Sequence, residues 1–382
     1  MEKTKDKHPI VLLLAMTSYA GMGPYVATII NYFKEDESIR YFVIEREDKY
    51  YTRNIHPSIK GKIIEEKSPS KLTTLKRMLI PSADSYAEKI LQYCINENIS
   101  FVHSLTSLSD IRLTCKLVKN YSLLYTVHDL HPHEAKKVFY KEWRQNVYYK
   151  RIFKAIEKVD YLFTNSKSQL NEQKILYPDK RSFFAPFPSL ITDEIASGKD
   201  TPYELIGIQN YILFFGRIEE YKGINILVKA FLQANIKDTK LVIAGRGDAK
   251  ITKNSNIIFI NRYIKDSEIA NLFLNASCVV YPYISATQSG VLSLASYFQI
   301  PAIVSDVSFF KEVLGNDYLC MFENKNINSL TSIILKYYSQ GFDISMIKKQ
   351  LSQIYDNNYS KTSQKDIIKN IYNLIINRKS TL

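Results

Sequence analysis

The sequence predicts an α/β protein built from two Rossmann-like, doubly wound parallel-sheet domains. Its 382 residues exceed the size of about 250–300 residues at which single cores stop growing. Short apolar runs alternate with helical stretches through both halves, which is the pattern of parallel sheets covered by helices. The alternation restarts after the proline-containing segment 185–202. The domains we expect are 1–190, a linker at 191–207, 208–360, and a C-terminal helix at 361–382 that packs back on the first domain.

The first domain begins with the continuous apolar run PIVLLLAM, which is typical of a strand that is buried on both faces. Pro24 suits the first turn of the helix that follows, over 24–33. Further strands are expected at 40–45, 99–104, 122–127 and 160–165. Helical stretches at 84–97 and 108–119 separate them.

The second domain repeats this order. Its expected strands are 211–216, 240–245, 257–261, 277–283 and 301–305, and its expected helices are 224–235, 266–275 and 290–299. An amphipathic pattern at 364–377 predicts a final helix. Two such domains would place a ligand cleft at their interface, outside the carboxyl ends of the strands.

Composition narrows the classes of function. Hydrophobic residues make up 46% and charged residues 23%, which excludes a disordered chain. The net charge of +13 suits anionic partners such as phosphorylated ligands or an anionic membrane. The 4 cysteines form no CxxC pair, so we expect reduced thiols in a cytoplasmic chain and no zinc. No apolar run is long enough to span a bilayer, so a membrane role would be peripheral, on the inner face.

A glycine cluster, Gly21 and Gly23, lies between the first strand and the first helix. Glycines at such a position let backbone N–H groups approach a phosphate. The dinucleotide fingerprint needs a third small residue where this chain has Val26, although Glu45 stands where a ribose-binding acid would lie. An NAD site and a glycine-rich turn without a ligand therefore remain alternatives.

The segment TVHDLHPHE places His128 directly after a strand, with Asp129, His131, His133 and Glu134 behind it. A metal site would need further histidine ligands, and no histidine follows His133. We favour His128 as a polar group that contacts a sugar or phosphate. The alternatives are a packed residue at the end of the strand and a metal ligand.

The strongest local signal is ILFFGRIEEYKG, where Arg217 and Lys222 follow a strand and Gly223 opens a helix. This spacing aims two cations and a helix N-terminus at one point, which suits a diphosphate. The alternative is a solvated turn in which Glu219 and Glu220 pair with both cations. A second turn, with Gln288, Ser289 and Gly290 after Thr287, offers hydrogen-bond donors at another helix start, or is a plain N-cap.

The stretch 135–158 reads as a helix with eight basic and two acidic residues, a net charge of +6. Lys137, Lys141 and Arg144 lie on its polar face, near Trp143. A basic face with aromatic residues suits an anionic lipid surface. The alternative is a solvated helix on a sheet, and no nucleic-acid motif is present.

Together, these segments resemble the retaining family 4 (group 1) glycosyltransferases of the GT-B fold. The resemblance covers most of the chain and rests on TVHD, FGRIEEYKG, LVIAGRGD, INRYIKDSEIANLFLNASCVVYPY and ATQSGV…IPAIVS. It implies that Arg217 and Lys222 bind the donor diphosphate and take part in catalysis, and that His128 lines the site near the transferred sugar. It also implies donor contacts from Gly21 and Gly23, from the base-binding loop Asn261–Ile264 with Tyr263, and from the turn Gln288, Ser289 and Gly290.

One departure stands out. Most members of that family carry two glutamates with seven residues between them, and these positions are Ala286 and Leu294 here. The sequence has the form of an ATQSGV-type subgroup without the paired glutamates. Contacts to the sugar and the ribose are then expected from Gln288, Ser289 and backbone amides.

The sequence therefore predicts a glycosyltransferase that needs no cofactor or metal. It would move a sugar from a UDP- or GDP-linked donor to a glycan or lipid-linked acceptor, in bacterial surface polysaccharide synthesis. Retention of the anomeric configuration is implied by the resemblance alone. A sugar-nucleotide epimerase of the same fold and a non-catalytic scaffold that binds nucleotide sugars are the alternatives.

Overall fold

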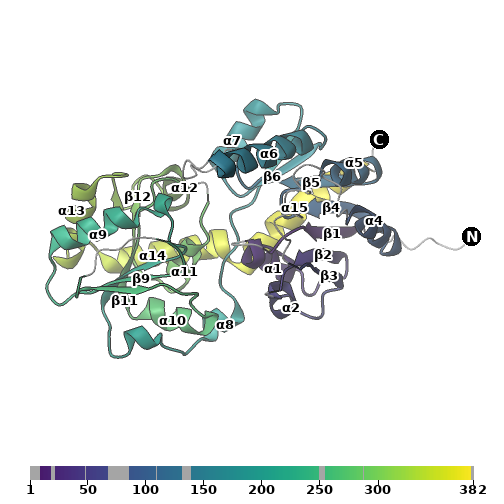
Figure 1. Ribbon diagram of the computed structural model, residues 1–382. Coiled ribbons are helices and arrows are strands. Elements are labelled where there is room, and N and C mark those ends of the chain that lie inside the picture. Colours follow the sequence, from purple (N-terminus) through teal and green to yellow (C-terminus); the bar gives the residue numbers. More distant parts are fainter. Residues whose placement is uncertain are drawn as a thin grey trace, which may run out of the picture. The chain divides into compact units, whose positions relative to one another are not determined.

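The computed structural model describes residues 9–18, 22–47, 49–67, 86–108, 110–130, 139–248, 254–286 and 288–379. The chain divides into two compact units. The first comprises Met1–Pro186 together with Gln364–Leu382, and the second is Phe187–Ser363. In Figure 1 the first unit runs from purple to blue and ends in the yellow C-terminal helix, and the second runs from teal to yellow-green.

The first unit is built on a seven-stranded sheet in the order β3-β2-β1-β4-β5-β6-β7. Every neighbouring pair in it is parallel. The strands are β1 (Ile10–Ala15), β2 (Ile39–Glu45), β3 (Gly61–Glu65), β4 (Ile99–Ser104), β5 (Ser122–Thr126), β6 (Tyr161–Thr164) and β7 (Arg181–Phe184).

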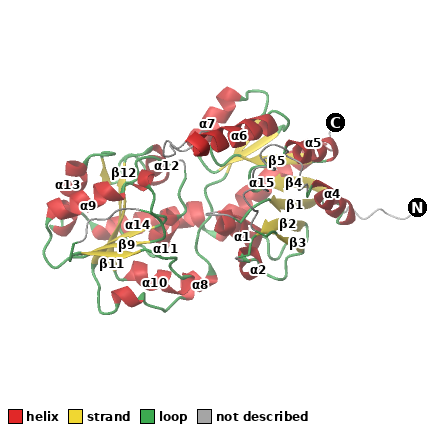
Figure 2. Ribbon diagram, viewed as in Figure 1, coloured by secondary structure: helices red, strands yellow, loops and turns green. Residues whose placement is uncertain are grey.

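Helices cover both faces of this sheet, as Figure 2 shows. They are α1 (Met22–Tyr32), α2 (Tyr50–Asn54), α4 (Ala87–Asn96), α5 (Ile111–Asn120), α6 (Phe139–Ile156), α7 (Lys167–Leu176) and α15 (Lys361–Lys379). Buried residues of α4, α5 and α6 form one core with alternate residues of the strands, such as Leu12, Leu14 and Val102.

From Gln364 onward, the C-terminal helix α15 belongs to the first unit. Its Tyr372 is buried against the other face of β4, where its ring lies 5.4 Å from Phe101 and its hydroxyl 2.6 Å from Nδ1 of His103. Lys369 adds an ion pair of 2.6 Å to Asp36. Burial lowers the pKa of His103 to about 3, so this histidine is neutral in the fold.

The second unit holds a six-stranded parallel sheet in the order β10-β9-β8-β11-β12-β13. The strands are β8 (Tyr211–Phe215), β9 (Leu241–Ala244), β10 (Ile257–Ile260), β11 (Ala276–Tyr281), β12 (Ala302–Ser305) and β13 (Met321–Phe322). Its helices are α8 (Asp193–Ser197), α9 (Ile224–Ala234), α10 (Asp266–Leu274), α11 (Val291–Tyr297), α12 (Ser308–Leu314), α13 (Ile327–Tyr338) and α14 (Ile344–Ile354). Three shorter helical turns complete it: η1 (Tyr203–Leu205), η2 (Glu220–Lys222) and η3 (Tyr355–Tyr359).

The predicted fold class is confirmed, because each half is a parallel sheet with helices on both faces. The segment predicted as a linker, 191–207, differs from the expectation. It contains α8 and η1, and its Ile195 and Leu205 are buried in the core of the second unit. The unit boundaries fall after Pro186 and after Ser363. Strands β3, β7 and β13 were not predicted.

In both sheets the chain winds first to one side and then to the other. The first unit reverses between β1 and β4, and the second between β8 and β11. Loops at the carboxyl ends of such neighbouring strands leave in opposite directions, which opens a place for a ligand. This rule selects the loops after β1 and β4, and those after β8 and β11.

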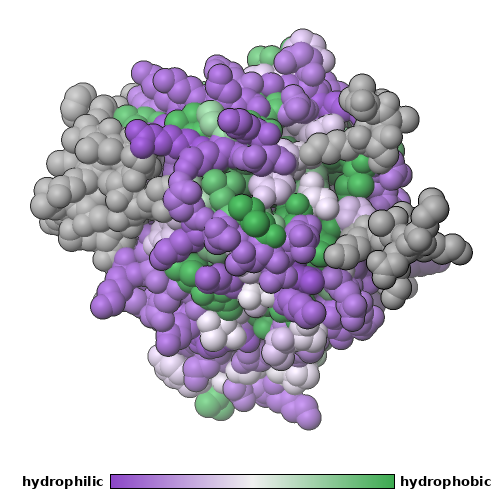
Figure 3. All heavy atoms as spheres, turned by 90° about the vertical axis from the view of Figure 1, so that its right-hand side faces the viewer, coloured by the Kyte–Doolittle hydropathy of each residue, from purple (hydrophilic) through white to green (hydrophobic). Residues whose placement is uncertain are grey.

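Two properties concern membranes. Within the described ranges no helix is both long and apolar enough to cross a bilayer. The face of the molecule shown in Figure 3 is mostly hydrophilic, and its apolar residues are divided into small areas.

Candidate functional site

The loop after β8 and the loop after β11 are locked together in the second unit. Gly223 has a φ of +69°, and a Cβ there would lie 1.8 Å from the carbonyl oxygen of Pro282. The backbone N–H of Ile284 donates to the carbonyl of Tyr221 at 2.8 Å. Only glycine allows this approach, so Gly223 sets how closely the segment with Arg217 and Lys222 meets the strand end of β11.

Arg217 is exposed and already paired. Its Nη1 lies 2.9 Å from Oε1 of Glu219, and 55% of its side chain is exposed. An ion pair at such a site contributes at most about 1 kcal/mol, so an anionic ligand can compete for the guanidinium.

Lys222, in contrast to Arg217, is buried. Only 8% of it is exposed, and its Nζ lies 3.6 Å from the ring centroid of Tyr283 and 4.9 Å from that of Tyr221. Within the described part of the chain no carboxylate forms an ion pair with it. Burial, with help from Arg217 and against Glu219, lowers the pKa of Lys222 to about 7. The solvated turn with paired cations therefore describes Arg217 and not Lys222.

The turn before α11 contacts Tyr283, the same side chain that Lys222 contacts. Ser289 is buried, and its Oγ lies 3.3 Å from the hydroxyl of Tyr283. Gln288 is partly buried beside it, and Thr287 lies outside the described residues. A Cβ on Gly290 would come within 2.7 Å of Leu190, so packing accounts for this glycine. The structure thus brings Lys222 to the ring face and Ser289 to the hydroxyl of one tyrosine.

The two positions that carry glutamates in most family 4 enzymes present no acid here. Leu294 is 1% exposed on α11 and forms part of the core. Ala286 is partly buried and packs against the same core. A sugar or ribose at this turn would therefore meet Gln288, Ser289 and the backbone.

The loop after β10, where a base was expected to bind, is rigidly supported. Arg262 forms ion pairs with Glu204 at 2.9 Å and Glu268 at 2.7 Å. Asn261 accepts a hydrogen bond of 3.1 Å from the backbone N–H of Gly247. Tyr263 is 65% exposed, and its hydroxyl donates to Asp266 at 3.0 Å.

In the first unit, Gly23 is buried at the start of α1, and a Cβ on it would lie 3.0 Å from the ring of Tyr50. Gly21 lies outside the described residues. Glu45, the acid that an NAD site would need, is 2% exposed. Its two carboxylate oxygens accept hydrogen bonds from the backbone N–H and the hydroxyl of Thr52. Glu45 therefore fixes α2 to β2, which removes the support for an NAD site.

His128 follows β5 and is held by the fold. Its Nε2 donates to the carbonyl of Leu105 at 2.9 Å, and the ring of Tyr25 meets it edge-on with centroids 4.9 Å apart. The amide of Gln169 donates to the carbonyl of His128 at 2.7 Å. A carbonyl only accepts, so the proton is on Nε2, and burial lowers the pKa of His128 and keeps it neutral.

The metal alternative has no support from the described residues, among which no group of three or more His, Cys, Asp or Glu could hold an ion. His131, His133 and Glu134 lie outside them.

The predicted membrane helix is α6, which starts at Phe139. The side chains of Lys137, Lys141, Trp143 and Arg144 lie outside the described residues. In the described part, Ile152 and Ile156 are buried while Lys150 and Lys154 are exposed, which is an amphipathic arrangement.

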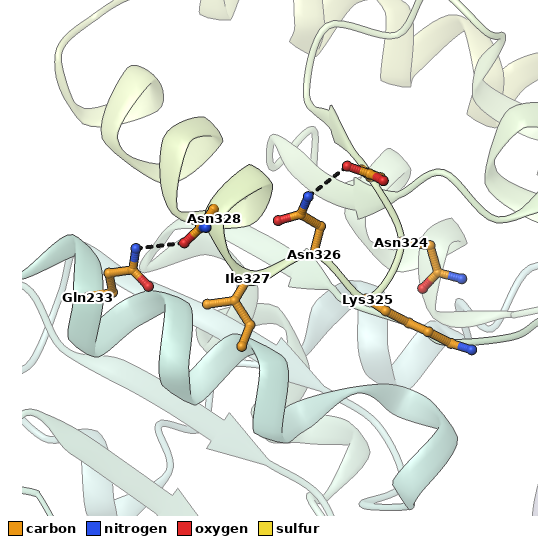
Figure 4. A pocket seen from close by; sticks show the side chains of 7 residues that line it. Gln233, Asn324, Lys325, Asn326, Ile327 and Asn328 are labelled. Carbon is orange, nitrogen blue, oxygen red and sulfur yellow. Dashed lines mark hydrogen bonds between the residues drawn. The ribbon is translucent and has the colours of Figure 1, made fainter.

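A pocket lies elsewhere in the second unit, between α9 and the start of α13 (Figure 4). Its side chains bond mainly to one another: Gln233 donates to Asn328 at 2.9 Å, and Asn326 donates to Glu323 at 2.6 Å. Asn326 also caps α13 by accepting from the N–H of Ser329 at 3.0 Å. These contacts fix a helix start, and none of the predicted site residues lines the pocket.

Comparisons with known proteins agree with this arrangement. Residues 202–361 match the model of a family described as glycosyl transferases group 1. No curated protein matches the sequence. The match spans most of the second unit and includes Arg217, Lys222 and the turn before α11.

Solved structures of the same fold cover nearly the whole chain. Sucrose-phosphate synthase from Thermosynechococcus elongatus has a TM-score of 0.70 at 15% identity, covering 97% of this chain and 100% of that one. HepE of Anabaena, in complex with UDP and glucose, has a TM-score of 0.67 at 15% identity, covering 95% and 99%. WaaG, a glycosyltransferase involved in lipopolysaccharide biosynthesis, has a TM-score of 0.65 at 14% identity, covering 95% and 99%. The fold is therefore GT-B, and the second unit carries the group 1 glycosyl transferase match.

Sequence reasoning missed Tyr283 and Tyr221. Both lie inside motifs that were singled out, YPY and EEYK, but an aromatic residue beside a strand end usually signals packing. The signal that could have led to them is Lys222, because a buried lysine needs a partner and an aromatic ring can serve as one.

Proposed function

We propose that the protein is a glycosyltransferase that uses a nucleotide-sugar donor. The observation that carries this is Lys222, a buried cation without a carboxylate partner among the described residues, at the point where the sheet of the second unit reverses. The family match over 202–361 supports the reaction class.

In this proposal the donor diphosphate lies against Arg217 and Lys222. Charge-assisted hydrogen bonds to a phosphate are strongest in a partly dry site, and Lys222 is in one. UDP and glucose bound to HepE, which shares the fold, support a UDP-linked sugar, and a GDP-linked sugar remains the second choice. The base would lie at the supported loop Asn261–Ile264, with Tyr263 exposed to it.

The chemical step breaks the bond between the anomeric carbon and the diphosphate oxygen, and the oxygen of an acceptor hydroxyl forms the new bond to that carbon. The acceptor hydroxyl gives up its proton to the departing diphosphate. Negative charge grows on the departing diphosphate, and preorganised cations stabilise it there. Arg217 and Lys222 supply that charge, and the start of α9 directly after Gly223 adds to it. Retention of configuration is proposed from the resemblance to family 4.

We assign the acceptor, a glycan or lipid-linked precursor, to the first unit. His128 is neutral there, so it acts as a polar contact to a sugar hydroxyl rather than as a charged group. A role in bacterial surface polysaccharide synthesis agrees with the reported role of WaaG in lipopolysaccharide biosynthesis. A lipid-linked acceptor would also fit peripheral binding of α6 to an anionic membrane.

Calorimetry with UDP and GDP tests the donor site, and product analysis tests the reaction. A transferase binds one of them and leaves a donor sugar unchanged until an acceptor is added. An epimerase would change a UDP- or GDP-sugar without an acceptor. A protein that binds neither nucleotide and changes no donor would overturn the proposal.

A further inference from the structure

Tyr283 is among the most firmly held side chains of the second unit. It follows β11 and is fully buried, with 0% of its surface exposed. The rings of Phe310 and Tyr281 pack against it, with centroids 5.3 Å and 5.8 Å away. Its backbone carbonyl accepts a hydrogen bond of 2.7 Å from the hydroxyl of Ser305 on β12.

Two loops contact this fixed side chain, one at the ring face and the other at the hydroxyl. Nζ of Lys222, which comes from the loop after β8, lies 3.6 Å from the ring centroid. The hydroxyl of Tyr283 lies 3.3 Å from Oγ of Ser289, in the turn before α11. The parallel pairing of β8 with β11 brings the first of these contacts together, because it places both strand ends at one edge of the sheet.

We propose that Tyr283 is a positioning residue of the donor diphosphate site, which holds Lys222 on its ring face and the turn at Ser289 through its hydroxyl. The inference rests on the proposed function, since it assigns Lys222 to the diphosphate.

An aromatic ring suits this task better than a carboxylate. The ring face attracts a cation, so it compensates part of the cost of burying the ammonium group. It carries no net charge, so it does not compete with the diphosphate for Lys222. Arg217, by contrast, is paired with a carboxylate. When an anion binds, it must displace Glu219 or share the guanidinium with it.

Positioning also reduces the entropy that binding costs. A lysine has several rotatable bonds, and ordering them on binding weakens affinity. Lys222 is already ordered between the rings of Tyr283 and Tyr221. Removing the ring of Tyr283 should therefore reduce what Lys222 contributes to binding, even though the lysine remains.

A double-mutant cycle measures this directly, with the affinity for UDP or GDP, whichever binds, determined by calorimetry. In the unaltered protein Lys222→Ala should weaken binding by roughly 10- to 150-fold, the range of charge-assisted hydrogen bonds. In a Tyr283→Leu background the same change should cost less than about threefold, because the two residues act as one unit. The matched control is Tyr211→Leu, a buried tyrosine at the start of β8 whose hydroxyl donates to the carbonyl of Leu272 at 2.7 Å. Lys222→Ala should keep its full penalty in that background. An equal penalty in the unaltered and the Tyr283→Leu proteins overturns the proposal.

The hydroxyl contact gives a second test if Tyr283→Leu does not fold. Tyr283→Phe and Ser289→Ala should each weaken nucleotide binding by roughly 2- to 10-fold, as loss of one neutral hydrogen bond does. The double variant should cost no more than either single one. Additive losses would separate the two residues and contradict the hydroxyl half of the proposal.

A readout without a ligand separates this inference from the proposed function. In protein labelled with ¹³Cε-lysine, the NMR signal of Lys222 is the one missing from Lys222→Ala. The ring current of Tyr283 should shift it upfield, and Tyr283→Leu should remove that shift while Tyr211→Leu retains it. If neither UDP nor GDP binds but the shift behaves in this way, the proposed function fails and the placement of Lys222 by Tyr283 stands. A Lys222 signal that is the same in both leucine variants overturns the placement itself.

Discussion

Each unit places a buried titratable base after a strand of its parallel sheet, yet the two bases make different contacts. His128 follows a strand of the first sheet and Lys222 follows a strand of the second, and burial lowers the pKa of both. His128 donates its N–H to the carbonyl of Leu105, so its hydrogen-bonding direction is set by the backbone. Among the contacts that the structure describes, Nζ of Lys222 meets only the faces of two rings.

This difference indicates which of the two side chains can contribute free energy to the binding of an anion. A neutral histidine fixed by the backbone can orient a hydroxyl but adds little affinity for an anion. A buried lysine that contacts aromatic rings contributes much more to affinity for a phosphate. The bound phosphate provides a negative charge beside the ammonium group, and none of the described carboxylates forms an ion pair with that group. The first unit should therefore influence turnover, and the second should influence donor affinity.

The largest expected effect tests the first half of this comparison. His128→Ala should lower kcat by roughly 10- to 1000-fold, the scale of a polar contact made in the transition state. The affinity for the nucleoside diphosphate should stay within about threefold, since a neutral histidine contributes little to anion binding. Steady-state kinetics with calorimetry separates the two quantities. A normal kcat with a raised KM would return His128 to a binding or packing role. Tyr372→Phe serves as the control, because it disturbs buried His103 on the same sheet and should leave kcat unchanged.

Lys222→Ala should have the next largest effect, and it should appear in affinity. Losing a buried ammonium group should weaken nucleoside diphosphate binding by roughly 10- to 150-fold. Because charge on the diphosphate grows in the transition state, kcat/KM should fall at least as far. Lys229→Ala, on the exposed side of α9, is the matched control and should leave affinity unchanged. Equal affinities for the unaltered protein and Lys222→Ala would contradict the placement of the diphosphate at Lys222.

Arg217→Ala should cost less than Lys222→Ala, roughly 2- to 10-fold in the same binding constant. Its guanidinium is exposed and paired with Glu219, so a ligand gains only the difference between the two partners. Raising the salt concentration should shrink the Arg217 effect more than the Lys222 effect, since exposed charges are screened more strongly. The opposite salt dependence, measured by calorimetry at two ionic strengths, would contradict the contrast between an exposed and a buried cation.

The same residues show how far the sequence could predict the site. Arg217 and Lys222 follow a strand and precede Gly223 within one short segment, so local pattern suffices to place them on one loop. Tyr283 comes from β11, and its meeting with Lys222 depends on β11 pairing with β8. That pairing is a long-range property that no local periodicity contains. Leu105, the partner of His128, follows β4 and was missed for the same reason.

The fold shows the same division between local and long-range information. The buried strands of each sheet are continuous apolar runs and were predicted within a few residues. Strands β3 and β7 lie at the edges of the first sheet and are largely exposed or half-buried, so neither alternates apolar and polar residues clearly. The segment 191–207 was predicted as a linker from its prolines and polar residues. Its Ile195 and Leu205 are nevertheless buried in the core of the second unit.

The smallest expected effect is the uptake of a proton on nucleotide binding, which depends on Lys222 and not on His128. With a pKa of about 7, lowered by burial and by Arg217 against the opposing effect of Glu219, Lys222 is mostly neutral at pH 8. A bound diphosphate favours the ammonium form and raises this pKa, so binding at pH 8 should take up close to one proton. The uptake should fall as the pH drops below 7, because Lys222 is then already charged.

Calorimetry at pH 8 in buffers of different ionisation enthalpy measures that uptake. UDP and GDP are fully ionised at this pH, so the ligand itself contributes little. Lys222→Ala should abolish the uptake, and His128→Ala should leave it unchanged, because the lowered pKa of His128 keeps that residue neutral before and after binding. Uptake that survives Lys222→Ala would place the titrating base elsewhere. It would then show that Lys222 does not change its protonation state when the nucleotide binds.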